Sequence, residues 1–187
     1  EQGCQVAISV HHKDDAGDLI TRHGDRVLVL EGDLSQRSEA VRATAQIAAQ
    51  WAALDGLIIN AGTCDYLALP LTDTVIRNLV QSNLAASTHC LDSATPLLAQ
   101  GQAPQVVGIL SAQTLLQVYE ASQPARASNN LAQLFDDARD TLARHAIDLT
   151  VVAPQTRSRP LTVAIALPGE WSAADAASAI LQRLPDR

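Results

Sequence analysis

The sequence lacks methionine, has a single lysine at Lys13, and contains few aromatic residues. Aromatics make up 3% of the 187 residues and apolar residues make up 47%, so any core must be built from Val, Ile, Leu and Ala. The formal net charge is -7 and the arginines are scattered. Without a basic cluster to neutralise phosphates, nucleic-acid binding is not expected. The length fits one domain over residues 1–187.

Several targeting and ligand signals are also absent. No apolar run approaches the roughly 20 residues that a membrane span needs, and no secretory signal is visible. Cys4, Cys64 and Cys90 are an odd number without metal-ligand spacing. We therefore expect three small buried hydrophobes in a reduced, cytoplasmic protein, and no metal site. The missing methionine and an opening just before an apolar run predict that the chain begins part-way into a domain.

Short apolar runs alternate with amphipathic stretches along the chain. The runs predict strands at 5–10, 26–33, 54–62, 105–112 and 147–154, and 155–169 predicts a loop or a loop with a short extra strand. The other stretches predict helices at 14–24, 35–51, 72–100, 125–145 and 172–184. This alternation is typical of right-handed βαβ units. We expect an α/β fold with a doubly wound, Rossmann-like parallel sheet in three layers.

Two of the predicted helices have periodic apolar residues that assign an inner face. In 35–51 the residues that can share a face are Val41, Ala45, Ala48 and Ala49. In 125–145 the apolar face contains Leu131, Leu134, Phe135, Ala138 and Leu142. Three aspartates on this second helix, Asp136, Asp137 and Asp140, are interpreted as a solvated face and not as metal ligands.

Polar residues follow most of the predicted strands, at the edge where a doubly wound sheet binds its ligand. They are His11, His12 and Lys13 after the first strand, Asp33 after the second, Asn60 to Gly62 after the third, Ser111 after the fourth, and Pro154 with Gln155 after the fifth. Any one position can simply be a polar end of a strand. The joint pattern is what predicts a binding site.

In this order the motifs resemble the short-chain dehydrogenase/reductase family over nearly the whole chain. The resemblance implies that the cofactor is NAD(P) and that Asp33, with Leu34 after it, contacts adenine. It also places Asn60, Ala61 and Gly62 in the family's Asn-Asn-Ala-Gly motif, and Pro154 in its Pro-Gly motif. A basic group near His11 would favour the 2′-phosphate of NADP.

The same resemblance implies catalytic residues. Asn83 in QSNLAAS matches the family's structural and catalytic asparagine, and Ser111 in GILSA matches its catalytic serine. The family's Tyr-x-x-x-Lys pair would fall on Pro124 and Ser128, which cannot supply the acid or the lysine. Losing a positioned general acid typically costs about 10² to 10⁴ in rate. Tyr119 in YEASQ is the alternative acid, although it lies close to Ser111 along the chain.

The family's glycine-rich turn is also missing. That turn holds the cofactor's pyrophosphate with backbone N–H groups and a helix N-terminus. This chain has nine glycines, and no two of them are spaced to form such a turn. Its first strand corresponds to the family's second, so the first strand and the turn are expected to be absent.

Three functions stay open at this point. The first is a member of NAD(P)-dependent oxidoreductase lineage, acting on a carbonyl or secondary alcohol in the ancestor and catalytically impaired here. The second is an active reductase whose remaining segments lie outside this sequence, for which an intact mass well above 19.8 kDa would argue. The third is a non-enzymatic binding module, a homodimer or tetramer through helices 72–100 and 125–145.

Overall fold

Parallel strands alternate with helices in the computed structural model, which describes residues 3–60, 73–110, 131–154, 165–167 and 173–182. Four residues predicted to form the site, Ala61, Gly62, Ser111 and Tyr119, lie outside these ranges. In the described part of the chain, no helix has both the length and the apolar character needed to cross a membrane.

The described residues up to Gln50 include a two-stranded parallel sheet. β1 (Val6–Val10) pairs with β2 (Val27–Glu31), and Val6 lies opposite Val27. Between the strands lie the 3-10 helix η1 (Lys13–Ala16), the helix α1 (Gly17–His23) and a short 3-10 turn. Gly24 ends α1 with a φ of 54°, as predicted from its type. Helix α2 (Arg37–Gln50) follows β2.

The described residues from Gly56 onward include a four-stranded parallel sheet. Its strands, in spatial order, are β3 (Gly56–Ile59), β4 (Gln105–Ile109), β5 (Asp148–Pro154) and β6 (Ile165–Leu167). β6 is the short extra strand that the sequence offered as one possibility. The helices of this part are α3 (Asp73–Leu98), α4 (Leu131–Arg144) and α5 (Ala173–Leu181).

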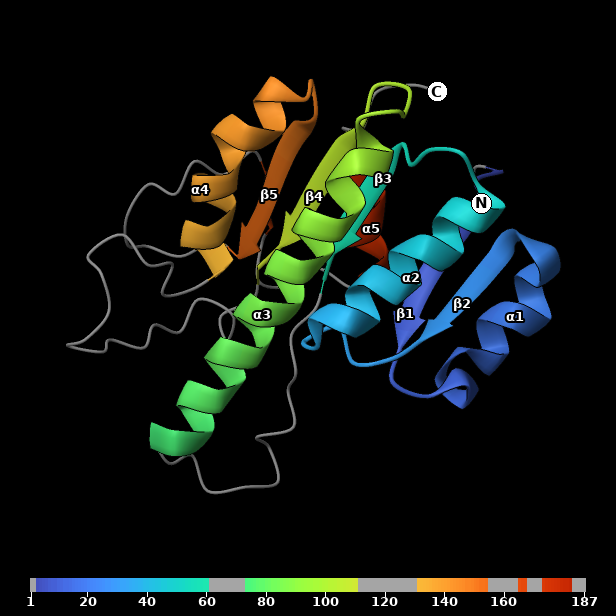
Figure 1. Cartoon of the computed structure of the whole chain (residues 1–187), viewed down its shortest axis with the longest axis horizontal. Helices are drawn as coiled ribbons and strands as arrows, with labels where there is room; N and C mark the ends of the chain where they lie inside the picture. The colour runs from blue at the N-terminus through green and yellow to red at the C-terminus, as the bar shows by residue number, and fades with distance from the viewer. Residues whose placement is uncertain (1–2, 61–72, 111–130, 155–164, 168–172, 183–187) are drawn as a thin grey trace.

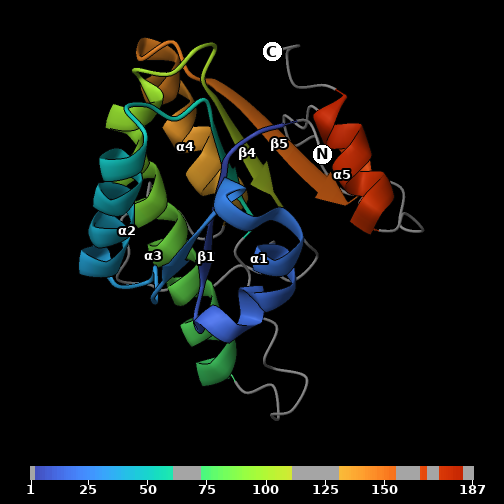
Figure 2. The same cartoon turned by 90° about the vertical axis from the view of Figure 1, so that its right-hand side faces the viewer.

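Helices cover both faces of the strands. Figures 1 and 2 show α2, α3 and α4 on one face, and α1 and α5 on the other. The three-layer, parallel α/β prediction is thereby confirmed. The strands nevertheless form two sheets, because no described strand joins β1 to β3.

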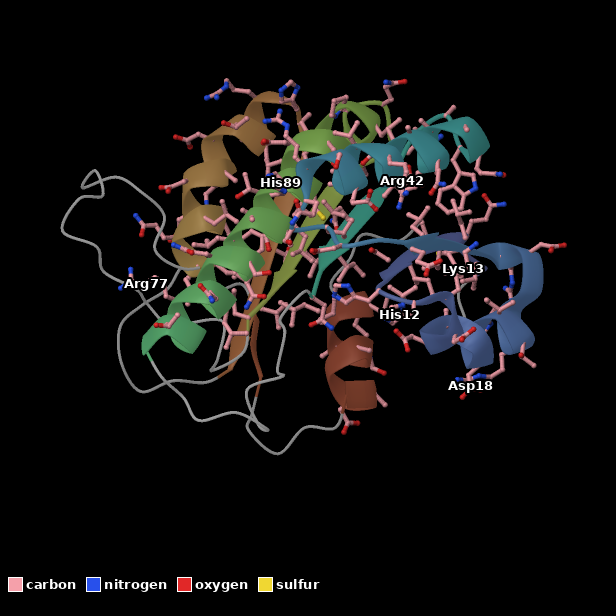
Figure 3. The ribbon with its side chains drawn as sticks, turned by 60° about the horizontal axis from the view of Figure 1, so that its bottom comes forward. His12, Lys13, Asp18, Arg42, Arg77 and His89 are labelled. Carbon is pink, nitrogen blue, oxygen red and sulfur yellow. The ribbon has the colours of Figure 1, made fainter. Side chains whose placement is uncertain are left out.

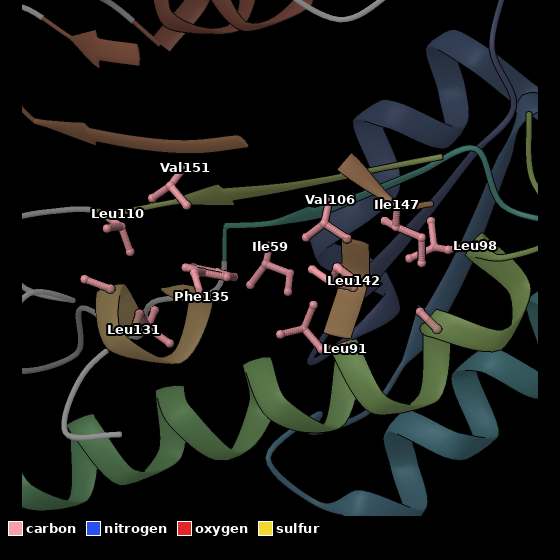
Figure 4. Packing of buried hydrophobic residues seen from close by; sticks show 12 residues of the cluster. Ile59, Leu91, Leu98, Val106, Leu110, Leu131, Phe135, Leu142, Ile147 and Val151 are labelled. Carbon is pink, nitrogen blue, oxygen red and sulfur yellow. The ribbon is translucent and has the colours of Figure 1, made fainter. Parts of the chain in front are cut away.

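The main hydrophobic core lies between the four-stranded sheet and helices α3 and α4 (Figure 4). Its largest fully buried side chain is Phe135, the single phenylalanine of the chain. The ring of Phe135 lies against the backbone of Gly108 in β4, where an added Cβ would come within 2.5 Å of two ring carbons. A smaller cluster on the opposite face joins Ile180 of α5 to Val107 and Val152.

Two predictions about burial are corrected. The predicted inner face of α2 is wrong, because Val41 is 52% exposed and Ala40 is buried instead. Alanines dominate this helix, and polar bonds from Arg42 and Thr44 decide its rotation. Cys4 is exposed, because the part of the chain that precedes β1 packs against little. Cys90 is partly buried, and Cys64 lies outside the described residues.

Candidate functional site

The candidate site lies at the carboxyl ends of β1 and β2. The two strands stay in register to their last residues, and the Gly32 N–H donates to the Val10 carbonyl at 3.0 Å. His11 and Asp33 therefore leave neighbouring strand ends, and both side chains are exposed. The structure places these two residues at adjacent strand ends, at the same edge where the sequence analysis expects them.

Asp33 is held in its ionised form. The Ser35 N–H donates to Asp33 Oδ1 at 2.9 Å. Hydrogen bonds from the Ser35 hydroxyl and backbone lower the pKa of Asp33 below its ordinary value, and an electrostatic contribution from His11 lowers it further. An exposed carboxylate that stays charged can accept hydrogen bonds from the hydroxyl or amino groups of a ligand.

A side chain of helix α3 forms a hydrogen bond with the backbone of the loop that follows Asp33. His89 Nδ1 lies 3.3 Å from the Leu34 carbonyl oxygen, which can only accept, so the proton is on Nδ1. Figure 3 labels His89 on α3. Leu34 itself is half-buried. Sequence reasoning missed this role of His89, because residues 55 positions apart give no local signal.

The neighbour of His89 is chemically inert. Burial raises the pKa of the Cys90 thiol to about 11, so the thiol stays protonated at neutral pH. A protonated thiol is a poor nucleophile. His89 and Cys90 are therefore not a nucleophile–base pair.

The other described site residues belong to the second sheet and its helix α3. Asn83 is half-buried on α3, six residues before His89, which corresponds to about 9 Å along a helix axis. Asn60 is exposed and follows the buried Ile59 at the end of β3. Pro154 ends β5 and lies opposite Leu167 of β6. Asn60 and Pro154 thus mark the carboxyl ends of two strands of the second sheet.

A pocket of about 290 Å³ opens beside β2, lined by Lys13, Val29, Glu31, Arg42 and Gln46. Lys13 belongs to the basic segment proposed from the sequence, and Figure 3 labels it together with Arg42. Arg42 donates to the Glu31 carbonyl at 2.7 Å and forms an ion pair with Glu39. The carboxylates of Glu31 and Glu39 offset the positive charges of Lys13 and Arg42, so the pocket lacks the excess positive charge that a phosphate site needs.

The described residues fit only one end of a dinucleotide. Asp33, Leu34 and His11 offer hydrogen-bonding groups for an adenosine. The diphosphate would need a helix N-terminus free of negative charge. Helix α1 follows β1 at this edge, but Asp14, Asp15 and Asp18 lie in and before its first turn. Helix α2 has Glu39 in its first turn, so neither helix suits a diphosphate.

Comparison with known proteins gives a consistent family assignment. A family model described as short chain dehydrogenase matches residues 1–165. Cis-2,3-dihydrobiphenyl-2,3-diol dehydrogenase of Paraburkholderia xenovorans is 26% identical over 117 residues, which are 59% of this chain and 42% of that protein. The match thus spans less than half of the relative.

Solved structures agree on the fold. A short-chain dehydrogenase from Streptomyces avermitilis superimposes with a TM-score of 0.63 at 20% identity, covering 97% of this chain and 69% of that chain. A metagenomic short-chain oxidoreductase in complex with NADP gives a TM-score of 0.69 at 18% identity, covering 99% and 81%. At these identities the likeness shows the fold alone.

Proposed function

The chain belongs to the short-chain dehydrogenase family, and from this premise we propose that it binds NAD(P) only weakly and has lost efficient reductase activity. The observation that carries the proposal is that Pro124 and Ser128 stand where the family has its proton-donating tyrosine and its lysine. Among the described residues, the groups suited to the cofactor lie at its adenosine end, around Asp33.

We assign the residual cofactor contacts to the adenosine end. Asp33 would accept hydrogen bonds from the nucleoside, Leu34 would pack against the base, and His11 would lie beside them. Asn60, Ala61, Gly62 and Pro154 would line the path toward the reacting ring. Nothing described is suited to hold the diphosphate between these two groups.

The ancestral substrate class would be a carbonyl or a secondary alcohol. Ser111 would hydrogen-bond the carbonyl oxygen, and Asn83 would hold a water or a backbone carbonyl nearby. Tyr119 is the candidate proton donor. Because Pro124 and Ser128 replace the family's tyrosine and lysine, we expect proton delivery to be slow.

Calorimetric titration of the 187-residue chain with NADPH and with NADH tests the proposal. We expect no micromolar binding to either dinucleotide. Saturation-transfer NMR should show weak contacts to adenine protons that fade in Asp33→Asn. The control Asp25→Asn changes an exposed aspartate at the opposite end of β2 and should leave the contacts intact. Micromolar affinity together with dinucleotide-dependent carbonyl reduction would contradict the proposal.

Assembly through α3 and α4 stays a prediction. The two helices pack against each other within the chain, and α4 exposes Asp136 and Asp137. A homodimer or tetramer would have to cover these carboxylates or leave them at its rim. Light scattering over a range of concentrations measures the oligomeric state directly.

A further inference from the structure

The peptide unit between Leu34 and Ser35 takes part in two hydrogen bonds, one at each end. Its carbonyl oxygen, which belongs to Leu34, lies 3.3 Å from His89 Nδ1 on α3. Its N–H group, which belongs to Ser35, donates to Asp33 Oδ1 at 2.9 Å. The carbonyl and the N–H of a trans peptide point in opposite directions within one rigid plane. The bond from α3 to the carbonyl therefore also sets the direction in which the N–H reaches the Asp33 carboxylate.

The bond from His89 differs in kind from the other bonds of this turn. The Gln36 N–H donates to the Asp33 carbonyl at 2.9 Å, so both this bond and the bond from Ser35 join residues that are two or three positions apart. His89 is 55 positions away from Leu34 and lies on another helix. Asp33 is exposed, whereas Leu34 is half-buried. The exposed carboxylate is thus connected to the body of the protein through the peptide that His89 holds.

α3 contacts α2 one helical turn beyond His89. The Ser93 hydroxyl donates to the His89 carbonyl at 2.6 Å, and Thr44 Oγ1 of α2 donates to Ser93 Oγ at 3.0 Å. Residues four apart on a helix lie on the same side, so His89 and Ser93 both face the β2–α2 segment. The contact to the turn and the contact to α2 use different side chains. They can therefore be removed one at a time.

We propose that His89 is a positioning residue for adenosine, because it holds the Leu34–Ser35 peptide that orients the Asp33 carboxylate. This role rests on the proposed function, in which Asp33 accepts hydrogen bonds from the nucleoside. A hydrogen bond accepted by a peptide carbonyl polarises the peptide and strengthens the bond that its N–H donates. The imidazole thus acts through the peptide and does not itself need to touch the nucleoside.

Two variants at position 89 of the 187-residue protein test this role without any ligand. His89→Leu removes the donor, whereas His89→Asn keeps a side-chain N–H near the place of Nδ1. The readout is the pKa of Asp33, measured by NMR of its carboxyl carbon. Hydrogen bonds from Ser35 are the main cause of the lowered pKa of Asp33. We expect His89→Leu to raise this pKa toward its ordinary value and His89→Asn to keep it lowered.

Adenosine is the ligand probe, because it carries the base and the ribose without a diphosphate. Chemical-shift titration gives its dissociation constant. We expect His89→Leu to weaken adenosine binding by about three- to tenfold, as for the loss of one neutral hydrogen bond, and His89→Asn to restore most of the affinity. Circular dichroism checks that each variant is folded. His89→Gln, whose amide lies further from the backbone than Nδ1 does, is a second variant that should lose the bond.

Thr44→Val is the matched control. It removes the neighbouring contact between α2 and α3 but keeps the donor to Leu34. We expect the pKa of Asp33 and the affinity for adenosine to stay as in the unmodified chain. A role of His89 in packing alone would make Thr44→Val and His89→Leu behave alike.

A failure of the proposed function gives a different result from a failure of the role of His89. If the unmodified chain does not bind adenosine, the adenosine assignment is wrong, and the pKa of Asp33 in His89→Leu still decides whether His89 positions the carboxylate. The positioning role is overturned if His89→Leu leaves both the pKa of Asp33 and the adenosine affinity unchanged. It is also overturned if His89→Asn or Thr44→Val changes both quantities as much as His89→Leu does.

Discussion

At the scale of single residues, Gly108 has little space for a side chain. It lies in β4 beneath the Phe135 ring, and an added methyl group would overlap the ring. Phe135 is fully buried and belongs to the main core, so the ring has little room to withdraw. The absence of a side chain at this glycine is thus a packing requirement.

We predict that Gly108→Ala lowers the free energy of unfolding by about 1 to 3 kcal/mol, because it overpacks the core. Urea unfolding followed by circular dichroism measures the loss. The matched control is Gly17→Ala, where the new methyl group meets nothing within 4 Å, and stability should hold or rise slightly. A Phe135→Leu background should reduce the penalty at position 108. If Gly108→Ala is neutral in both backgrounds, the close contact is wrong.

Some of the residue-level packing could be predicted and some could not. On α4 the apolar stripe was correct, since Leu131, Phe135 and Leu142 are buried. Large side chains at helical spacing leave one choice of face. On α2 the prediction failed, because its alanines offer nearly equal faces. Distant contacts such as Thr44 with Ser93 then decide the rotation, and a sequence pattern does not contain them.

At the scale of elements, helix α4 ends in a common C-terminal motif, but an alanine occupies the position that usually needs glycine. The Ile147 N–H donates to the Leu142 carbonyl at 3.0 Å, and the Ala146 N–H donates to the Ala143 carbonyl at 3.0 Å. Leu142 and Ile147 are both buried. This is the Schellman arrangement, in which the left-handed position is usually glycine. Here it is Ala146, with a φ of 56°.

We predict that Ala146→Gly raises the free energy of unfolding by about 0.5 to 1 kcal/mol, because glycine adopts this conformation without a Cβ clash. Thermal unfolding by calorimetry measures the gain. Ala143→Gly, in the last turn of the same helix, should instead lower stability by about 1 kcal/mol. If both variants changed the free energy of unfolding in the same direction, helix propensity alone would govern the C-terminal end of α4.

The existence and order of the elements could be read from the sequence, but their ends could not. Of the predicted strand 54–62, the described residues 54–60 form a strand over Gly56–Ile59, where they pair with β4. At the site, the chain order placed His11 and Asp33 correctly at adjacent strand ends. The His89 contact that fixes Leu34 depends on how α3 lies over the sheet, which local patterns do not encode.

At the scale of the whole molecule, stability is unevenly distributed. The main core draws its buried residues from β3, β4, β5, α3, α4 and the segments that adjoin them. In residues 3–50, which contain β1, β2, α1 and α2, the buried residues are Ala16, Leu30 and Ala40. A two-stranded sheet with so little burial depends on its attachment to the rest of the fold.

We therefore predict that β1 and β2 open before the rest of the fold. Native-state hydrogen exchange should give lower opening free energies for the amides of β1 and β2 than for those of β4 and β5. Removing the Thr44 hydroxyl with Thr44→Val should widen the difference by weakening the contact between α2 and α3. Equal opening free energies in both sheets would show a single cooperative unit and contradict this picture.

The contact between the Phe135 ring and the backbone of Gly108 also makes substitutions at these two positions depend on each other during evolution. A larger residue at 108 is tolerable only after the aromatic ring has been replaced, and a smaller residue at 135 leaves a void that a new methyl group at 108 can fill. Descendants of this sequence should therefore exchange the two residues as a pair, with the ring lost before, or together with, the glycine.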